Sequence, residues 1–200
     1  DVWGINAYRG NVYSGFGQLY NQFSSLSERA LLITEFGCPS STRNANRDFI
    51  MMQQNSKSQA DYLKVHWEDM VNNTPVCSGG YAFSWVDEWW KIGNIGTQDQ
   101  HDARNYAFPG TYADEEAFGL LALEVDCNNI GGWATRKDKV LPRSAYYVMG
   151  QMFGAFDVLP DVSYQPISYP RCNGQWIGDP NAPNRSEEHT SELQSPDHLV

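Results

Sequence analysis

One acidic residue, Glu35, directly follows an apolar run, and its position is the first in the sequence to suggest chemistry. The run, residues 31–34, reads Leu-Leu-Ile-Thr. A charge beside such a run is costly to bury unless it is paired or used. One interpretation is a carboxylate that attacks an electrophilic carbon. The alternative is a residue that caps a helix or forms a salt bridge at the end of a strand.

Three other side chains are predicted to reach the same rim as Glu35. Strand side chains alternate between faces, so Asn6 and Tyr8 share a face at the end of their strand. Trp85 ends a third strand and shares a face with Phe83. Tyr8 can donate its hydroxyl to the carboxylate and favour its ionised form, and Asn6 and Trp85 can contact a sugar. The alternative is that these side chains are ordinary core.

A long loop over residues 86–116 follows the third strand and mixes aromatic with polar residues. Loops of this length are often functional. Aromatic faces beside carboxylates suit sugars, so Asp87, Glu88 and Trp89 are candidate substrate-binding residues. The alternative is a structural cover for the fold. The charge run at residues 114–116 is expected to be solvated.

Alternating elements must position these residues. The predicted order is strand 2–8, helix 19–26, strand 31–35, helix 57–72, strand 79–85 and a last helix with Pro142 in its first turn. This order predicts an α/β fold with parallel strands and crossover helices. A barrel and a doubly wound sheet both fit, and both bind ligands at the carboxyl ends of the strands. No Gly-x-Gly-x-x-Gly follows a strand, which disfavours a dinucleotide or phosphate enzyme.

The histidines and cysteines indicate neither a catalytic triad nor a metal site. His66 and His101 stand alone, without a serine or cysteine in a nucleophile context, and His66 is expected to face solvent from its helix. None of the four cysteines belongs to a C-x-x-C pair, so a zinc site is not expected. No cofactor is predicted. Disulfides and buried free thiols both remain open for Cys38, Cys77, Cys127 and Cys172.

Composition excludes several classes of partner. A formal net charge of −10 argues against nucleic acid, whose phosphates need a basic surface. No apolar run approaches the roughly 18 residues needed to span a bilayer. The even cysteine count in an aromatic-rich chain suits a secreted or cell-surface protein, whose signal peptide would precede residue 1.

Three segments are expected along the chain. Residues 1–156 carry the alternating elements, and residues 157–184 form an extended C-terminal segment. Residues 185–200 read as the translation of a sequencing-library adapter and are excluded from the reasoning on the fold. The chain is expected to start inside a strand of a longer protein.

Several motifs, in order, resemble the rear part of clan A glycoside hydrolases. D-V-W-G-I-N-A-Y and L-L-I-T-E-F-G resemble strands six and seven of that clan, as found in family-2 β-glycosidases and fungal wall β-1,3-glucanosyltransferases. S-G-G-Y-A-F-S-W-V-D-E-W-W-K resembles strand eight and its loop, and D-E-E-A-F-G-L with P-R-S-A-Y-Y resembles the entry to the last helix. The resemblance covers residues 1 to about 155.

The resemblance implies the C-terminal part of a (β/α)8 TIM barrel that acts on carbohydrate. Glu35 would be the nucleophile, Tyr8 its hydrogen-bonding partner and Trp85 a sugar platform. The family's acid/base glutamate ends strand four, which would precede residue 1, so this chain alone is expected to be inactive. The implied reaction is retaining hydrolysis or transfer on β-linked glucan or a related polysaccharide. The alternative is a non-catalytic carbohydrate-binding or wall-scaffold protein on the same barrel.

Overall fold

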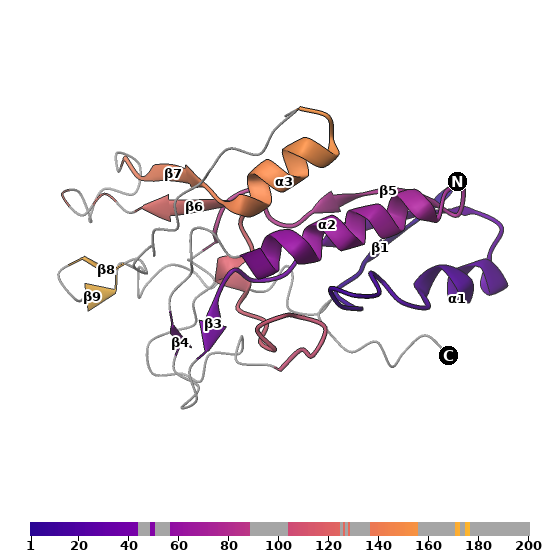
Figure 1. Ribbon diagram of the computed structural model, residues 1–200, viewed down its shortest axis with the longest axis horizontal. Helices are drawn as coiled ribbons and strands as arrows, with labels where there is room; N and C mark the ends of the chain where they lie inside the picture. Colours follow the sequence, from indigo (N-terminus) through magenta and orange to yellow (C-terminus); the bar gives the residue numbers. More distant parts are fainter. Residues whose placement is uncertain are drawn as a thin grey trace.

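Three strands form one parallel sheet in the computed structural model (Figure 1). β1 spans Val2–Asn6, β2 spans Ala30–Phe36 and β5 spans Cys77–Ala82. β2 lies in the middle and pairs in parallel with β1 on one side and β5 on the other. Helices separate these strands along the chain, so the predicted α/β class with a parallel sheet is confirmed.

Some of the sequence-based predictions fall outside the residues that the structure describes. Trp89 and the tail 185–200 lie outside them. Within segment 157–184, the structure describes two short antiparallel strands, β8 (Arg171–Cys172) and β9 (Gln175–Trp176). The described residues are 1–43, 49–50, 57–88, 104–124, 126, 128, 137–155, 171–172 and 175–176.

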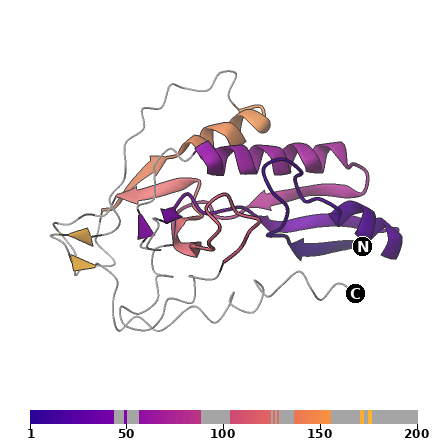
Figure 2. The same ribbon diagram turned by 60° about the horizontal axis from the view of Figure 1, so that its bottom comes forward.

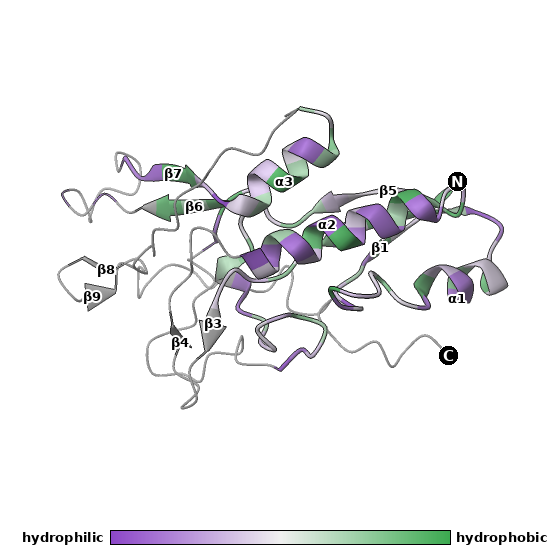
Figure 3. Ribbon diagram, viewed as in Figure 1, coloured by the Kyte–Doolittle hydropathy of each residue, from purple (hydrophilic) through white to green (hydrophobic). Residues whose placement is uncertain are grey.

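The helices α1, α2 and α3 bury their apolar residues against one face of β2. They span Leu19–Leu26, Lys57–Asn72 and Ser144–Met152, so the helices predicted at 19–26 and 57–72 are confirmed. α2 runs lengthwise over the sheet (Figure 2) and carries polar residues among its apolar ones (Figure 3). Among the described residues, no helix has the length and apolar character needed to cross a membrane. The shared core contains Leu19, Tyr20, Leu31, Ile33, Leu63, Met70, Ala145 and Met149.

The buried side of α2 is broader than its apolar spacing indicates. Ala60 and Leu63 are buried as expected, but Gln59, Tyr62 and His66 are buried as well. These three residues form a second row along the helix, because positions three and four apart lie on the same side. The expectation that His66 faces solvent is therefore wrong: it is fully buried.

An antiparallel hairpin precedes the last helix and corrects the placement of Pro142. β6 (Leu121–Glu124) pairs with β7 (Lys139–Pro142), so Pro142 ends a strand and does not lie in the first turn of α3. Proline is tolerated at the end of a two-stranded ladder because its missing N–H breaks no central hydrogen bond. Shorter elements are β3 (Thr42–Arg43) paired with β4 (Phe49–Ile50), and the 3-10 helix η3 (Glu115–Ala117).

Candidate functional site

Glu35 and Tyr8 form a hydrogen bond at the carboxyl ends of two neighbouring strands. Glu35 is the penultimate residue of β2, and Tyr8 lies just beyond β1. The Tyr8 hydroxyl donates to Glu35 Oε2 at 2.6 Å. The sheet register causes the meeting, because Asn6 pairs with Glu35 and the Ala7 N–H donates to the Glu35 carbonyl at 2.8 Å. The site therefore contains a carboxylate whose position is fixed by a phenol.

Aromatic rings enclose Tyr8 and keep it protonated. The rings of Phe83, Phe108 and Phe118 lie edge-on to Tyr8, with centroids 6.3, 6.3 and 5.7 Å away. Burial raises the pKa of Tyr8 far above its usual range, and the hydrogen bond to Glu35 and the charge of Glu35 raise it further. Tyr8 is therefore a permanent donor to the carboxylate at neutral pH.

Asn6 lies beside Glu35 at the same edge of the sheet. Its side-chain oxygen accepts a hydrogen bond of 2.7 Å from the Thr34 hydroxyl, which fixes the orientation of the amide. Asn6 and Thr34 are half-buried residues on adjacent strands. The structure thus brings together three predicted site residues, Asn6, Tyr8 and Glu35.

Phe83 is the residue of the segment around the end of β5 whose ring contacts Tyr8, and Trp85 packs against α3. β5 ends at Ala82, so the alternation that predicted a common face for Phe83 and Trp85 does not extend that far. The side chain of Trp85 is 63% exposed and its ring packs edge-on against Tyr146 of α3, with centroids 5.8 Å apart. The predicted shared face is therefore wrong. Phe83 directly follows Ala82, the last paired residue of β5, and an aromatic residue at that position could have been selected as a site candidate.

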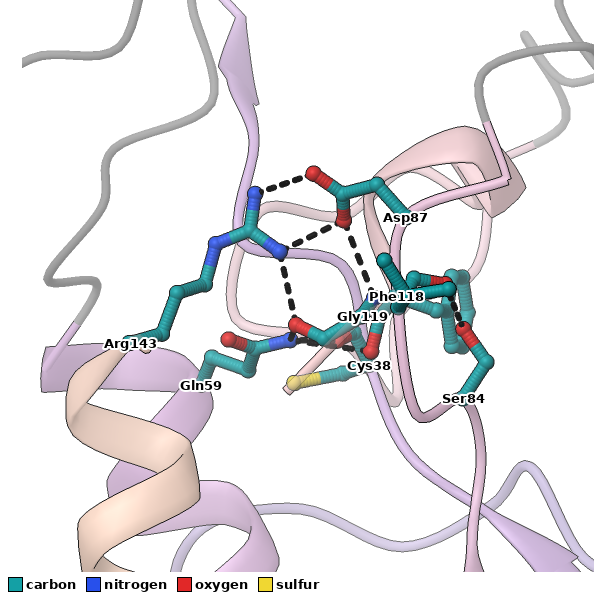
Figure 4. A network of polar contacts seen from close by, with 8 residues as sticks. Cys38, Gln59, Ser84, Asp87, Phe118, Gly119 and Arg143 are labelled. Atoms are coloured by element: carbon teal, nitrogen blue, oxygen red, sulfur yellow. Dashed lines mark hydrogen bonds and ion pairs between the residues drawn. The ribbon is translucent and has the colours of Figure 1, made fainter. Parts of the chain in front are cut away.

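Asp87 forms a buried ion pair with Arg143 (Figure 4). Arg143 Nη1 and Nη2 donate to the two carboxylate oxygens at 2.5 and 2.6 Å, and the Gly119 N–H donates to Asp87 Oδ1 at 3.1 Å. Burial raises the pKa of the Asp87 carboxyl, although Arg143 and the Gly119 N–H act in the opposite direction. In this structure the predicted sugar-binding Asp87 joins the loop after β5 to the start of α3.

Further acidic residues in the segment after β5 are buried or half-buried. Asp114 and Glu115 are buried, and Asp114 accepts a hydrogen bond from the Ser41 hydroxyl. The expectation that this charge run is solvated is wrong for both residues. After burial and Glu35, the charges of Glu115 and of the half-buried Glu88 also raise the pKa of Tyr8. The predicted site residue Glu88 therefore lies within electrostatic range of Tyr8.

Two cysteines are buried free thiols. Cys38 and Cys77 form no disulfide, and burial raises the pKa of both. The side chains of Cys127 and Cys172 lie outside the described set. Within that set, no group of three or more His, Cys, Asp and Glu side chains is arranged to hold a metal ion.

The buried His66 is expected to make stability depend on acid pH. Burial lowers its pKa below the usual 6.5, despite the opposing effects of two backbone carbonyls and Asp69. Below pH 6.5 the unfolded chain binds a proton that the folded protein resists, so the free energy of unfolding falls as pH decreases from 6.5 toward the folded pKa. The loss is about 1.4 kcal/mol per pH unit in that window. Urea denaturation at several pH values measures it.

His66→Phe is the matched variant for this pH dependence. Phenylalanine preserves an aromatic ring beside Phe16 and Tyr62, whose rings lie 4.5 and 3.8 Å from that of His66 between centroids. The variant should lose the His66 share of the acid dependence while the carboxyl groups titrate as before. An identical slope in the two proteins between about pH 5 and 6.5 would contradict the assignment.

The chain is an α/β protein with a parallel sheet and a tyrosine-bound carboxylate at the carboxyl edge of that sheet. Among solved structures, it is similar to a β-glucosidase from Exiguobacterium marinum, with 16% identity, a TM-score of 0.40, and coverage of 74% of this chain and 28% of that one. It is also similar to the β-glucosidase from Thermotoga maritima in complex with deoxynojirimycin, with 13% identity, a TM-score of 0.37, and coverage of 70% and 26%. The chain spans about a quarter of the length of these structures. No protein-family model and no curated protein matches it.

Proposed function

We propose that this chain is part of a retaining glycoside hydrolase or transglycosidase that acts on β-linked glucan or a related polysaccharide. Glu35 is the nucleophile that attacks the anomeric carbon and forms a glycosyl-enzyme ester. Water or a second sugar then resolves the ester. Tyr8 orients Glu35, and Asn6 and Glu88 contact the sugar. The complete protein is proposed to be secreted or on the cell surface.

The observation that carries this proposal is the 2.6 Å hydrogen bond from Tyr8 to Glu35. A retaining glycosidase needs one carboxylate that is ionised and fixed in orientation. Tyr8 meets the second need, because its hydroxyl donates to one carboxylate oxygen and fixes the orientation of Glu35. The edge where they meet is the usual location of ligands on parallel sheets.

The arrangement of the helices supports a barrel. Residues from α1, α2 and α3 share a core with Leu31 and Ile33 of β2, so these helices cover the same side of the sheet. A barrel places its helices outside a closed sheet, whereas a doubly wound sheet has helices on both faces. We propose that β1, β2 and β5 are strands six to eight of such a barrel.

Covalent labelling tests the nucleophile. The longest natural protein that contains this chain is incubated with a 2-deoxy-2-fluoro-glycosyl fluoride, which forms a slowly hydrolysed ester with the nucleophile of a retaining enzyme. We expect the label on Glu35, located by mass spectrometry of peptides. Label on another residue would overturn the assignment. Tight carbohydrate binding with neither label nor turnover would favour the non-catalytic alternative.

A further inference from the structure

The backbone carbonyl of Arg9, the residue after Tyr8, faces two side chains of α2. The Tyr62 hydroxyl lies 3.3 Å from this oxygen and donates to it. His66 Nε2 lies 3.0 Å from the same oxygen, and His66 Nδ1 lies 2.7 Å from the carbonyl of Tyr62. A neutral imidazole carries one N–H, so donation to Arg9 uses the Nε2–H tautomer or the imidazolium.

We propose that Tyr62 and His66 are positioning residues that hold Tyr8 on Glu35 by fixing the Arg9 carbonyl. This inference rests on the proposed function for its kinetic consequence. Tyr8 and Arg9 share a peptide bond, and the Arg9 carbonyl lies in the next peptide unit, so holding this carbonyl limits how far the backbone at Tyr8 can move. The Tyr8 hydroxyl must stay within hydrogen-bonding distance of Glu35 to orient it.

A second contact from α2 fixes the other end of the same loop. Asp69 accepts a hydrogen bond of 2.8 Å from the Phe16 N–H. The ring of Phe16 is fully buried and lies edge-on to His66. One face of α2 therefore holds both ends of the segment 9–16, which connects the residue after Tyr8 to the core.

The burial of His66 and Tyr62 agrees with a positioning role. Both are fully buried, with their rings stacked 3.8 Å apart between centroids. A buried polar side chain needs partners, and the Arg9 carbonyl is an acceptor within reach of both. An apolar residue would fill either position without this link between α2 and the loop.

The test follows the hydroxyl proton of Tyr8 by NMR in the full chain. The Tyr8 hydroxyl is hydrogen-bonded to the half-buried Glu35 carboxylate, so its exchange with water is slowed, and its signal is assigned by its loss in Tyr8→Phe. In His66→Phe and in Tyr62→Phe, we expect exchange to accelerate roughly fivefold to tenfold, as for the loss of one hydrogen bond. His66→Gln keeps an N–H donor and should restore exchange to within about threefold of the parent.

Trp67→Phe is the matched control on α2. Trp67 packs against Phe153, with ring centroids 4.7 Å apart, and its packing is on the α3 side of the helix. The control should leave exchange within about twofold of the parent. If His66→Phe does not fold, Tyr62→Phe alone decides, because it removes only a hydroxyl. Parent-like exchange in a folded Tyr62→Phe or His66→Phe protein overturns the positioning role.

Kinetics separate this inference from the proposed function. In an active complete enzyme, His66→Phe should lower kcat severalfold with little change in KM, because the nucleophile is misoriented while the sugar still binds. Faster hydroxyl exchange in the variants of a complete protein that has no glycosidase activity would keep the positioning role and reject the proposed function. Unchanged hydroxyl exchange in the variants of an active enzyme would reject the positioning role and keep the proposed function.

Discussion

Replacing Glu35 with glutamine is expected to lower kcat on an aryl β-glycoside by about four orders of magnitude, or roughly 5.5 kcal/mol in the barrier. The amide has almost the shape of the carboxylate but cannot form the glycosyl ester. Binding should change little, so KM stays within about tenfold of the parent. Steady-state kinetics of the complete protein measure both constants.

Glu28→Gln provides the matched control for this loss. It makes the same change of charge at an exposed glutamate before β2. Its kcat should equal that of the parent, because a surface charge outside the site adds little to the barrier. Turnover by Glu35→Gln at more than about a tenth of the parent rate would reject Glu35 as the nucleophile. Circular dichroism and urea denaturation should show that both variants remain folded.

Replacing Arg143 with methionine is expected to destabilise the protein by about 3–5 kcal/mol. Arg143 is fully buried and the Asp87 side chain is 2% exposed, so the variant leaves a buried carboxyl group without its cationic partner. The carbonyl of Gly119 also loses its 2.6 Å contact with Arg143 Nη1, although Gln59 Nε2 still donates to it at 3.3 Å. Urea denaturation followed by tryptophan fluorescence measures the change.

A double variant shows whether the loss comes from the buried charge. Asp87→Leu combined with Arg143→Met removes both charges and fills the space with apolar atoms, so it should recover most of the stability that Arg143→Met loses. Arg29→Met is the control, since the ion pair of Arg29 with Asp1 is exposed and should contribute less than about 1 kcal/mol. Equal decreases in the free energy of unfolding for Arg143→Met and Arg29→Met would show that the buried ion pair contributes no more than the exposed one.

The glycine beside this ion pair shows how tightly the segment after β5 is packed. A Cβ added to Gly119 would lie 2.3 Å from the backbone nitrogen of Asp87 and 2.5 Å from the carbonyl oxygen of Leu121. These are backbone atoms, which move only if the chain around them moves. The ion pair of Asp87 and Arg143 therefore forms where two backbone segments already pack closely.

Local sequence pattern predicted the elements that carry the candidate site. An apolar run followed by Glu35 gave β2, and the apolar spacing of residues 57–72 gave α2 with its observed bounds. The meeting of Tyr8 and Glu35 followed from the same reasoning. Strand alternation fixes which side chains share a face, and parallel pairing brings the carboxyl ends of neighbouring strands to one edge.

The polar residues with long-range partners were not predictable in this way. Asp87 has the same local setting as a loop carboxylate that binds sugar, but its partner Arg143 lies far along the chain. His66 has the polarity of a surface residue, but its ring contacts the Arg9 carbonyl. Burial of a polar group depends on a partner in space, and one-dimensional spacing carries no information on that partner.

The setting of Glu35, which follows an apolar run, was therefore determined partly by local sequence and partly by tertiary structure. The sequence determined its strand, its place at the carboxyl end and its nearness to Tyr8, because these depend on side-chain period and strand pairing. Only the tertiary structure decided that Phe83 and not Trp85 contacts Tyr8, and that α2 holds the next residue through His66. Those contacts depend on where β5 stops pairing and on how α2 packs across the sheet. Both depend on the packing of residues that are far apart in the sequence.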